Sequence, residues 1–491
     1  MFIGCTPNED PTTVPYWVDQ LDDRRTRTDA IHELGKLGKK EALPELIHWL
    51  QQEGDWQPAA AYAIGQIKDA SASQVLIEQI DFSAGGKSDR ASLNRNKTNI
   101  NIARALVMIK SPQAAAPLLR LLDGGDAKVR EAVMQALGHL GDAAAIEALT
   151  SVTQDDPEPF LRKVAVQALG DLGAPEGVPA LVQMLYREMP GVSFYADARF
   201  ALIQVGSAAV PLLLQTIDRK NEAVEALRLP DGAPFTPGAI EAKAASVLGA
   251  LRAKEAEERI IAALKKYHKL LPKPDAPTYP GIAGAVIELC YALGDLGGST
   301  AVAALLPLVS ATDPSVRLGV TEALTTIGDR SVVDTLLAAA KTGDVTAKKA
   351  TLVAASRLGG KAHLQSFDAL AQGDLAELAR NARPRLEAAA DCETNTACWT
   401  KKLTDPNAVV RERAAYELGW QAAAGGTPAL LKAAEDDDAQ VRMAAVLSLW
   451  RHDDVDRAKL QAILGAWETK IEYAGVNREL KRLIASLSRK R

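Results

Sequence analysis

Cysteines are the residues of this sequence with the most specific chemistry. Cys392 and Cys398 lie in the segment DCETNTACW, where a turn leads into a helix. A bond between them would close a short loop and stabilise the fold modestly, whereas two sulfur atoms are too few ligands for zinc. We therefore expect a Cys392–Cys398 disulfide, with two free cytoplasmic thiols as the alternative. Cys290 lies in an apolar helix and is expected to be a small buried hydrophobe.

Histidines offer the next candidates for chemistry. The sequence has six of them, and His32-Glu33 is its one His-Glu pair. A metal site with several His and carboxylate ligands needs more residues that converge. Phosphate-binding loops, nucleophile elbows and zinc-protease motifs are also missing from the sequence. We expect a protein that is not an enzyme, with no catalytic residue, no metal site and no cofactor.

The segment Phe2-Ile3-Gly4-Cys5 resembles the end of a bacterial lipoprotein signal, in which the cysteine becomes lipidated. The polar, proline-containing residues 6–13 then suit a tether, although no charged and full apolar signal regions precede Cys5. Because disulfides persist in oxidising compartments, we expect a periplasmic lipoprotein whose membrane contact is limited to a lipid on Cys5. A cytoplasmic location is the alternative.

The composition excludes several classes of protein. The 491 residues carry a net charge of −5, which does not favour a nucleic-acid binder. Basic residues cluster only at Lys87–Lys97, expected to be a solvated loop, and at Arg478–Arg491, expected to be a terminal helix. The sequence has no continuous apolar run long enough to span a membrane. Ala, Leu and Val dominate the apolar residues, which favours closely packed thin helices.

One pattern of two amphipathic helices recurs from end to end. The segments Val129–Val152 and Leu161–Leu185 both show apolar residues at helical spacing on each side of a turn. The turn recurs about every 31 residues and often holds glycine, which tolerates the left-handed conformation at a helix end. A degenerate repeat should turn near Ala390. The other predicted turn residues are Gly38, Lys68, Lys110, Gly141, Gly173, Gly206, Arg252, Gly297, Gly328, Gly359, Ala422 and Asp453.

The run DAKVREAVMQALGHLGD at Asp126–Asp142 resembles the HEAT repeat, in the short bacterial form named after phycobilisome lyases. The resemblance covers residues 14–465. It implies an all-α fold, a right-handed α-solenoid of about 13 helix pairs, because one pair cannot bury its apolar face alone. Residues 1–13 would be the lipobox-like start and tether. Residues 466–491 would form a C-terminal capping helix with a basic end.

Enzymes with similar repeats provide specific tests. Deoxyhypusine hydroxylases hold two irons with several His-Glu pairs, and the single pair here does not suffice. Phycobilin lyases need a tetrapyrrole pocket, which no motif in this sequence secures. HEAT-like DNA glycosylases use a basic concave face with aromatic residues, and the two basic clusters do not match this. We therefore expect no nucleic-acid partner.

A row of arginines occupies one repeat position: Arg130, Arg162, Arg317, Arg411 and Arg442. It would serve either as a ladder for an acidic partner or as a set of structural pairs with aspartates of neighbouring repeats. We favour the structural interpretation.

Three insertions lengthen the connections between successive helix pairs, at residues 81–97, 229–238 and 271–281. The second and third share the order Pro-Asp, Ala-Pro, aromatic, Pro-Gly, and we expect these loops to lie side by side. Prolines lower the entropy lost on ordering, and aromatic residues are enriched at binding hot spots. Phe235, Tyr279, Pro234 and Pro277 are therefore candidate partner-binding residues, with loop-on-loop packing as the alternative.

These features together favour a non-enzymatic scaffold that binds another protein through its concave surface or its inserted-loop edge. The expected protein is a monomer outside its complex. The alternative is a cytoplasmic phycobilin-lyase-like or regulatory protein that acts on a cofactor-bearing partner.

Overall fold

The computed structural model describes residues 10–467 except 84, 87, 274, 422–424 and 453. Thirteen helix pairs follow one another in this part of the chain, which confirms the predicted α-solenoid. The first helix of each pair is called helix A, and the second is called helix B. The right-handed sense of the solenoid stays a prediction.

The A helices form one layer of the fold. They are α2 (Arg27–Leu37), α4 (Gln57–Ile67), α6 (Arg90–Met108), α8 (Ala127–Leu140), α10 (Pro159–Leu172), α12 (Tyr195–Val205), α15 (Ala239–Ala250), α17 (Tyr279–Leu296), α19 (Pro314–Ile327), α21 (Val345–Leu358), α23 (Ala376–Cys392), α25 (Ala408–Gln421) and α27 (Ala439–Leu449).

The B helices form the other layer, and short 3₁₀ turns precede many of them. They are α3 (Leu43–Gln51), α5 (Ser73–Glu78), α7 (Ala115–Leu122), α9 (Ile146–Asp155), α11 (Val178–Met184), α13 (Val210–Ile217), α16 (Glu257–Lys269), α18 (Ser299–Leu305), α20 (Val333–Ala339), α22 (Leu364–Leu370), α24 (Thr396–Lys402), α26 (Gly426–Ala433) and α28 (Arg457–Trp467).

Two further helices and one hairpin lie outside this scheme. They are α1 (Val14–Asp19), α14 (Glu222–Glu225), and the antiparallel strands β1 (Glu188–Met189) and β2 (Val192–Ser193). The hairpin occupies the connection between α11 and α12 and turns at Gly191, whose φ is 73°. This short hairpin is the only strand pair among the described residues, and the predicted all-α fold is confirmed.

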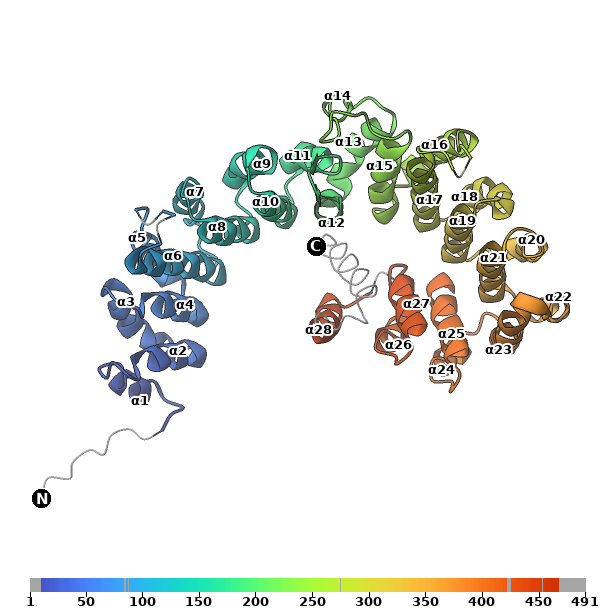
Figure 1. Cartoon of the computed structure of the whole chain (residues 1–491). Helices are drawn as coiled ribbons and strands as arrows, with labels where there is room; N and C mark the ends of the chain where they lie inside the picture. The colour runs from blue at the N-terminus through green and yellow to red at the C-terminus, as the bar shows by residue number, and fades with distance from the viewer. Residues whose placement is uncertain are drawn as a thin grey trace, which may run out of the picture. The chain divides into compact units, whose positions relative to one another are not determined.

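The chain divides into two compact units, residues 1–201 (unit 1) and 202–491 (unit 2), with the boundary inside α12. Within each unit the A helices line the inner, concave side of the row of repeats, and the B helices line the outer side (Figure 1). The exposed surface of the A helices is called the A face.

The turn residues were predicted well. Gly38, Lys68, Lys110, Gly141, Gly173, Gly206, Arg252, Gly297 and Gly328 all have positive φ. Gly359 does not, with φ of −67°, and Ala422 and Asp453 lie outside the described residues. The degenerate repeat reverses at Glu393, where φ is 45°, slightly later than the predicted Ala390.

The core lies between the two layers, and one motif position supplies much of it. Four residues before the turn, each A helix of unit 1 from α2 to α10 places a large apolar side chain that is 0–1% exposed: Leu34, Ile64, Leu106, Leu137 and Leu169. Burial of such a side chain stabilises the fold by about 1.5–3 kcal/mol. The next residue in α8, Gly138, lets α10 approach closely, since a Cβ there would lie 2.8 Å from the carbonyl oxygen of Ala168.

One segment, Tyr195–Ile217, is long and apolar enough by composition to cross a membrane, with a mean hydropathy of 1.7. It is not one continuous span. Gly206, with φ of 93°, separates α12 from α13, and 56% of the apolar window is buried. These properties suit the core helices of one repeat.

Candidate interaction surface

The arginine row is structural. In four of its five members the guanidinium donates to the carbonyl oxygen six residues earlier, and Arg27 does the same; the pairs are Arg27 with Leu21, Arg162 with Asp156, Arg317 with Ala311, Arg411 with Asp405 and Arg442 with Asp436. Arg130 and Arg411 also form ion pairs with Asp156 and Asp436 of the following connection. The row fixes the loops between repeats and does not form a ladder for an acidic partner.

His32 and Glu33, the single His-Glu pair, lie on helix α2. His32 is exposed on α2, and Glu33 forms an ion pair with Lys36 at 2.6 Å. Within the described ranges, no group of three or more His, Cys, Asp or Glu side chains could hold a metal ion.

Cys392 and Cys398 are joined by a disulfide, and their Cα atoms are 5.3 Å apart. The bond ties the end of α23 to the start of α24. Two other contacts stabilise the same turn: Asn395 accepts a hydrogen bond from the Cys398 amide, and the buried Trp399 indole donates to the Glu393 carbonyl at 2.9 Å. The oxidation state of the pair in solution stays a prediction. Cys5, the predicted lipidation site, lies outside the described residues.

The two proline-containing insertions, 229–238 and 271–281, contact each other as expected, although residues 279–281 form the first turn of α17 and not part of a loop. A Cβ on Gly281 would stand 2.5 Å from Cγ2 of Thr236. Both aromatic side chains are half-buried, and Pro234 and Pro277 are exposed. The Tyr279 hydroxyl donates to Asp313, the residue that caps α19. Tyr279 therefore joins consecutive repeats, and partner binding by these four residues stays a prediction.

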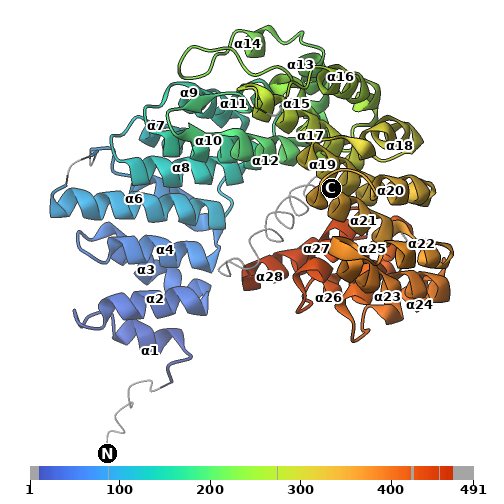
Figure 2. The same cartoon turned by 45° about the vertical axis from the view of Figure 1, so that its right-hand side comes forward.

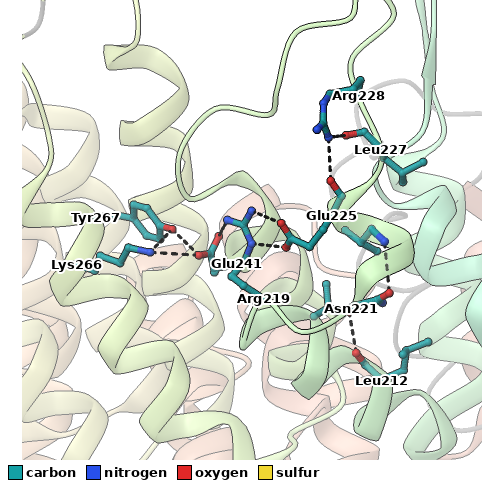
Figure 3. A network of polar contacts seen from close by, with 11 residues as sticks. Leu212, Arg219, Asn221, Glu225, Leu227, Arg228, Glu241, Lys266 and Tyr267 are labelled. Atoms are coloured by element: carbon teal, nitrogen blue, oxygen red, sulfur yellow. Dashed lines mark hydrogen bonds and ion pairs between the residues drawn. The ribbon is translucent and has the colours of Figure 1, made fainter.

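A polar network fixes the start of the 229–238 insertion (Figure 3). Arg219 donates two hydrogen bonds to Glu225 of α14, at 2.5 and 2.7 Å, and these bonds lower the pKa of Glu225. Arg219 also lies 3.5 Å from Glu241, a buried carboxylate that accepts a hydrogen bond from Tyr267. Burial, together with that bond, raises the pKa of Tyr267. The insertion is therefore anchored to α15 and α16.

Two A helices at the end of unit 2, α25 and α27, contact the A helices α19 and α21 of earlier repeats. Arg330, just after α19, lies 2.5 Å from Glu417 of α25, which is 87 residues later in the chain. Glu417 also pairs with Arg413 at 2.6 Å, and both side chains are fully buried. The Trp420 indole donates to the Thr325 carbonyl at 3.2 Å. Figure 2 shows α25 and α27 close beside α21.

A second set of ion pairs supports the same contact. Glu412 of α25 lies 2.7 Å from Arg357 of α21 and also pairs with Arg385 of α23. Burial alone would raise the pKa of Glu412, but the two arginines lower it. Burial lowers the pKa of Arg413 to about 10, despite Glu417. These side chains hold repeats together that are not neighbours in the array, so this part of the concave surface is occupied.

The A face of unit 1 is open by comparison. Six residues before the turn, each A helix from α2 to α10 exposes one side chain that can form hydrogen bonds: His32, Tyr62, Arg104, Gln135 and Gln167. Neighbouring helices pack about 8–10 Å apart, so these residues form a regular row. Phe160 on α10 and Leu93 on α6 add exposed apolar groups, 53% and 45% accessible.

Helix α6 is longer than its neighbours and corrects one prediction. Residues 90–97, expected to belong to a loop, are helical, and α6 begins at Arg90. Side chains of α6 hold it in place: Asn94 donates to the Gly54 carbonyl at 3.0 Å, Asn101 to the Pro58 carbonyl at 2.8 Å, and Asn99 to the Asp81 carbonyl at 2.7 Å. The extension forms one wall of an open cavity of about 620 Å³ against α2 and α4.

The repeats match a known family. A model for HEAT repeats matches residues 91–170, 118–192, 286–357, 302–383 and 397–471, which together exceed half of the chain. The chain belongs to the HEAT-repeat family. The resemblance inferred from Asp126–Asp142 is thereby confirmed, because that segment lies inside two of the matched ranges.

Relatives of this HEAT-repeat protein include phycobilisome-lyase-type proteins. The alpha subunit of phycocyanobilin lyase from Synechococcus elongatus is 39% identical over 101 residues, which are 20% of this chain. The match covers only 36% of that subunit's length. The predicted resemblance to the repeats of phycobilisome lyases is thereby confirmed for these 101 residues.

Two solved structures align with this chain at low sequence identity. Importin beta aligns with 96% of this chain and 72% of its own, at 12% identity and a TM-score of 0.49. The complex of CpcE and CpcF of phycocyanin lyase from Nostoc aligns with 43% of this chain and 82% of its own, at 21% identity and a TM-score of 0.27. The family assignment rests on the repeat model and not on these alignments.

Proposed function

We propose that this HEAT-repeat protein is a non-enzymatic scaffold that binds another protein through the A face of unit 1. The observation that carries the proposal is the row of exposed side chains on five consecutive A helices. In unit 2, the corresponding face of α19 and α21 is covered by α25 and α27. Extended concave surfaces are what solenoid proteins use for binding.

The chemistry of this face suits a protein interface. Tyr62, Leu93 and Phe160 are 36–53% exposed although all three are large and apolar. Aromatic anchors surrounded by polar groups are typical of binding hot spots. The loop edge is the weaker candidate, because Phe235 and Tyr279 are half-buried and Tyr279 already bonds to Asp313.

A double variant tests which surface binds. We expect Tyr62→Ala with Phe160→Ala to reduce partner capture roughly tenfold or more, because loss of one hot-spot side chain often costs at least ~2 kcal/mol. The measurement is quantitative affinity capture from the native organism, with partners identified by mass spectrometry. The matched control is Phe235→Ala with Tyr279→Ala. The proposal fails if the control loses capture and the A-face variant keeps it.

The sequence similarity supports one alternative, a lyase-like role on a bilin-bearing partner. The 39% identity to phycocyanobilin lyase subunit alpha is its basis. Incubation of the purified protein with phycocyanobilin distinguishes the two functions. A scaffold leaves the visible spectrum of the bilin unchanged, whereas a lyase-like protein shifts it or transfers the bilin to an acceptor protein.

We also propose that the protein functions in the bacterial periplasm as a lipoprotein anchored through Cys5. The disulfide between Cys392 and Cys398 supports an oxidising compartment. Protein isolated from native cells should therefore gain two hydrogens in mass after reduction, and Cys392→Ser should abolish that gain. Rapid alkylation of both thiols without reductant, on protein recovered from the cytoplasm, would contradict the proposal.

A further inference from the structure

The start of α6 differs from every other A helix in unit 1. It begins 20 residues before its turn residue Lys110, whereas α8 and α10 begin 14 residues before theirs. Asp89 caps this extended start by accepting a hydrogen bond from the Ser92 amide at 2.9 Å. Asn96 ties the helix to the Gly85 carbonyl at 2.8 Å and to Asp126 at 3.1 Å. The extension is therefore a fixed part of the surface.

The extension places a cavity next to unpaired positive charge. Leu93 and Lys97 of α6 line the cavity together with His32 of α2. Nearby on the A face are Arg104, which lies two turns further along α6, and Lys128 of α8, which occupies the position equivalent to Lys97. In the part of the chain that the structure describes, no ion pair involves Lys97, Arg104 or Lys128.

Two acidic residues lie close to these cations. Asp55, at the rim of the cavity, pairs with Arg90. Glu131 of α8 accepts a hydrogen bond from Gln135 at 3.4 Å. Because the Gln135 amide is neutral, Glu131 keeps its charge. The three cations outnumber this carboxylate and leave a local excess of positive charge beside the apolar Leu93, although the whole protein is acidic with a net charge of −5.

The spacing of the cations suggests the shape of the ligand. Lys97 and Arg104 are two helical turns apart, about 10 Å at 1.5 Å per residue, and Lys128 lies on the neighbouring helix at about 8–10 Å. In an extended peptide with polyproline II geometry, which has three residues per turn and rises 3.1 Å per residue, side chains three residues apart lie on the same side and are separated by about 9 Å. Carboxylates at that interval could meet two of the cations at once.

We propose that this surface binds an acidic, extended segment of the partner protein, with carboxylates on Lys97, Arg104 and Lys128 and an apolar side chain against Leu93. This inference rests on the proposed function, because it names the chemistry of the partner at the A face. Complementary charge steers association and selects the partner. The arginine row plays no part, because four of its guanidinium groups are bound to loop carbonyls and that of Arg130 is bound to Asp156.

Fluorescence anisotropy with a labelled peptide of repeating Glu-Leu-Gly units tests the proposal on the full chain. We expect binding that weakens with added salt. The variant Lys97→Glu, Arg104→Glu, Lys128→Glu should weaken binding at least about tenfold, because three ion pairs, each modest alone, are lost together and replaced by repulsion between like charges. The matched control, Lys39→Glu, Lys265→Glu, Lys341→Glu, makes the same change of charge at exposed sites elsewhere and should bind as the unmodified protein does.

Other outcomes separate the possibilities. No binding of the Glu-Leu-Gly peptide, or equal binding of a Lys-Leu-Gly peptide, would overturn the inference. Tighter binding of a single-stranded oligonucleotide at the same residues would assign the surface to nucleic acid and also overturn it. If Tyr62→Ala with Phe160→Ala abolishes partner capture but the acidic peptide does not compete with the partner, the scaffold function stands and only this inference fails.

Discussion

Replacement of Glu417 by leucine should destabilise the C-terminal repeats of unit 2 by about 3–5 kcal/mol, the cost of removing one partner of a buried ion pair. Glu417 accepts hydrogen bonds from Arg330 and Arg413, and without it Arg413 would be a fully buried cation with no carboxylate partner. Hydrogen exchange with mass spectrometry is the suitable measurement, because solenoids unfold in parts. Protection should fall in α25 and also around Thr325–Gly328.

The matched control is Glu387→Leu. Glu387 pairs with Arg383 at 3.5 Å on an exposed surface, so its loss should cost only about 0–1 kcal/mol. The decisive point is the pattern of exchange. Loss of protection confined to α23, α25 and α27, with α19 unchanged, would contradict the contact between repeats that are distant in sequence.

Substitution of Gly138 by alanine should lower the melting temperature although alanine favours helix. The new Cβ would lie 2.8 Å from the carbonyl oxygen and 2.9 Å from the Cα of Ala168, and backbone atoms cannot move aside as a flexible side chain would. Such overpacking costs about 1–3 kcal/mol, which exceeds the gain of up to ~1 kcal/mol in helix propensity. Circular dichroism during thermal unfolding measures the change.

Gly284 offers the matched control for this substitution. It also lies inside an A helix, α17, but a Cβ there would meet nothing within 4 Å. Gly284→Ala should therefore raise stability slightly. Equal effects of the two substitutions would show that close approach of α8 and α10 does not require the glycine.

The repeat architecture was predictable because each helix pair carries its own signals. The apolar residue four positions before each turn and the left-handed turn residue recur, so one repeat explains the next. Two positions depart from this pattern. Gly359 ends α21 without a positive φ, and Gly191 supports a strand hairpin where a simple connection was expected.

The candidate surface was less predictable from sequence. The extension of α6 could have been recognised from Asp89 and Ser92, a capping pair ahead of a polar run that is rich in asparagine. The self-contact in unit 2 had no such signal. Arg413 and Glu417 have helical spacing, but the third partner, Arg330, lies 87 residues from Glu417 and on a different repeat. Contacts of this kind follow from tertiary packing and not from the repeat pattern.

Site-specific cross-linking tests the central claim, that the A face of unit 1 holds the partner, most directly. A photoreactive amino acid replaces Gln135, which is exposed on α8, and in a second protein replaces Glu147, which is exposed on the B helix α9 of the same pair. After illumination with the captured partner, we expect a covalent adduct from position 135 and none from position 147. An adduct from position 147 alone, or from a photoreactive residue at Phe235 with none at position 135, would contradict the account.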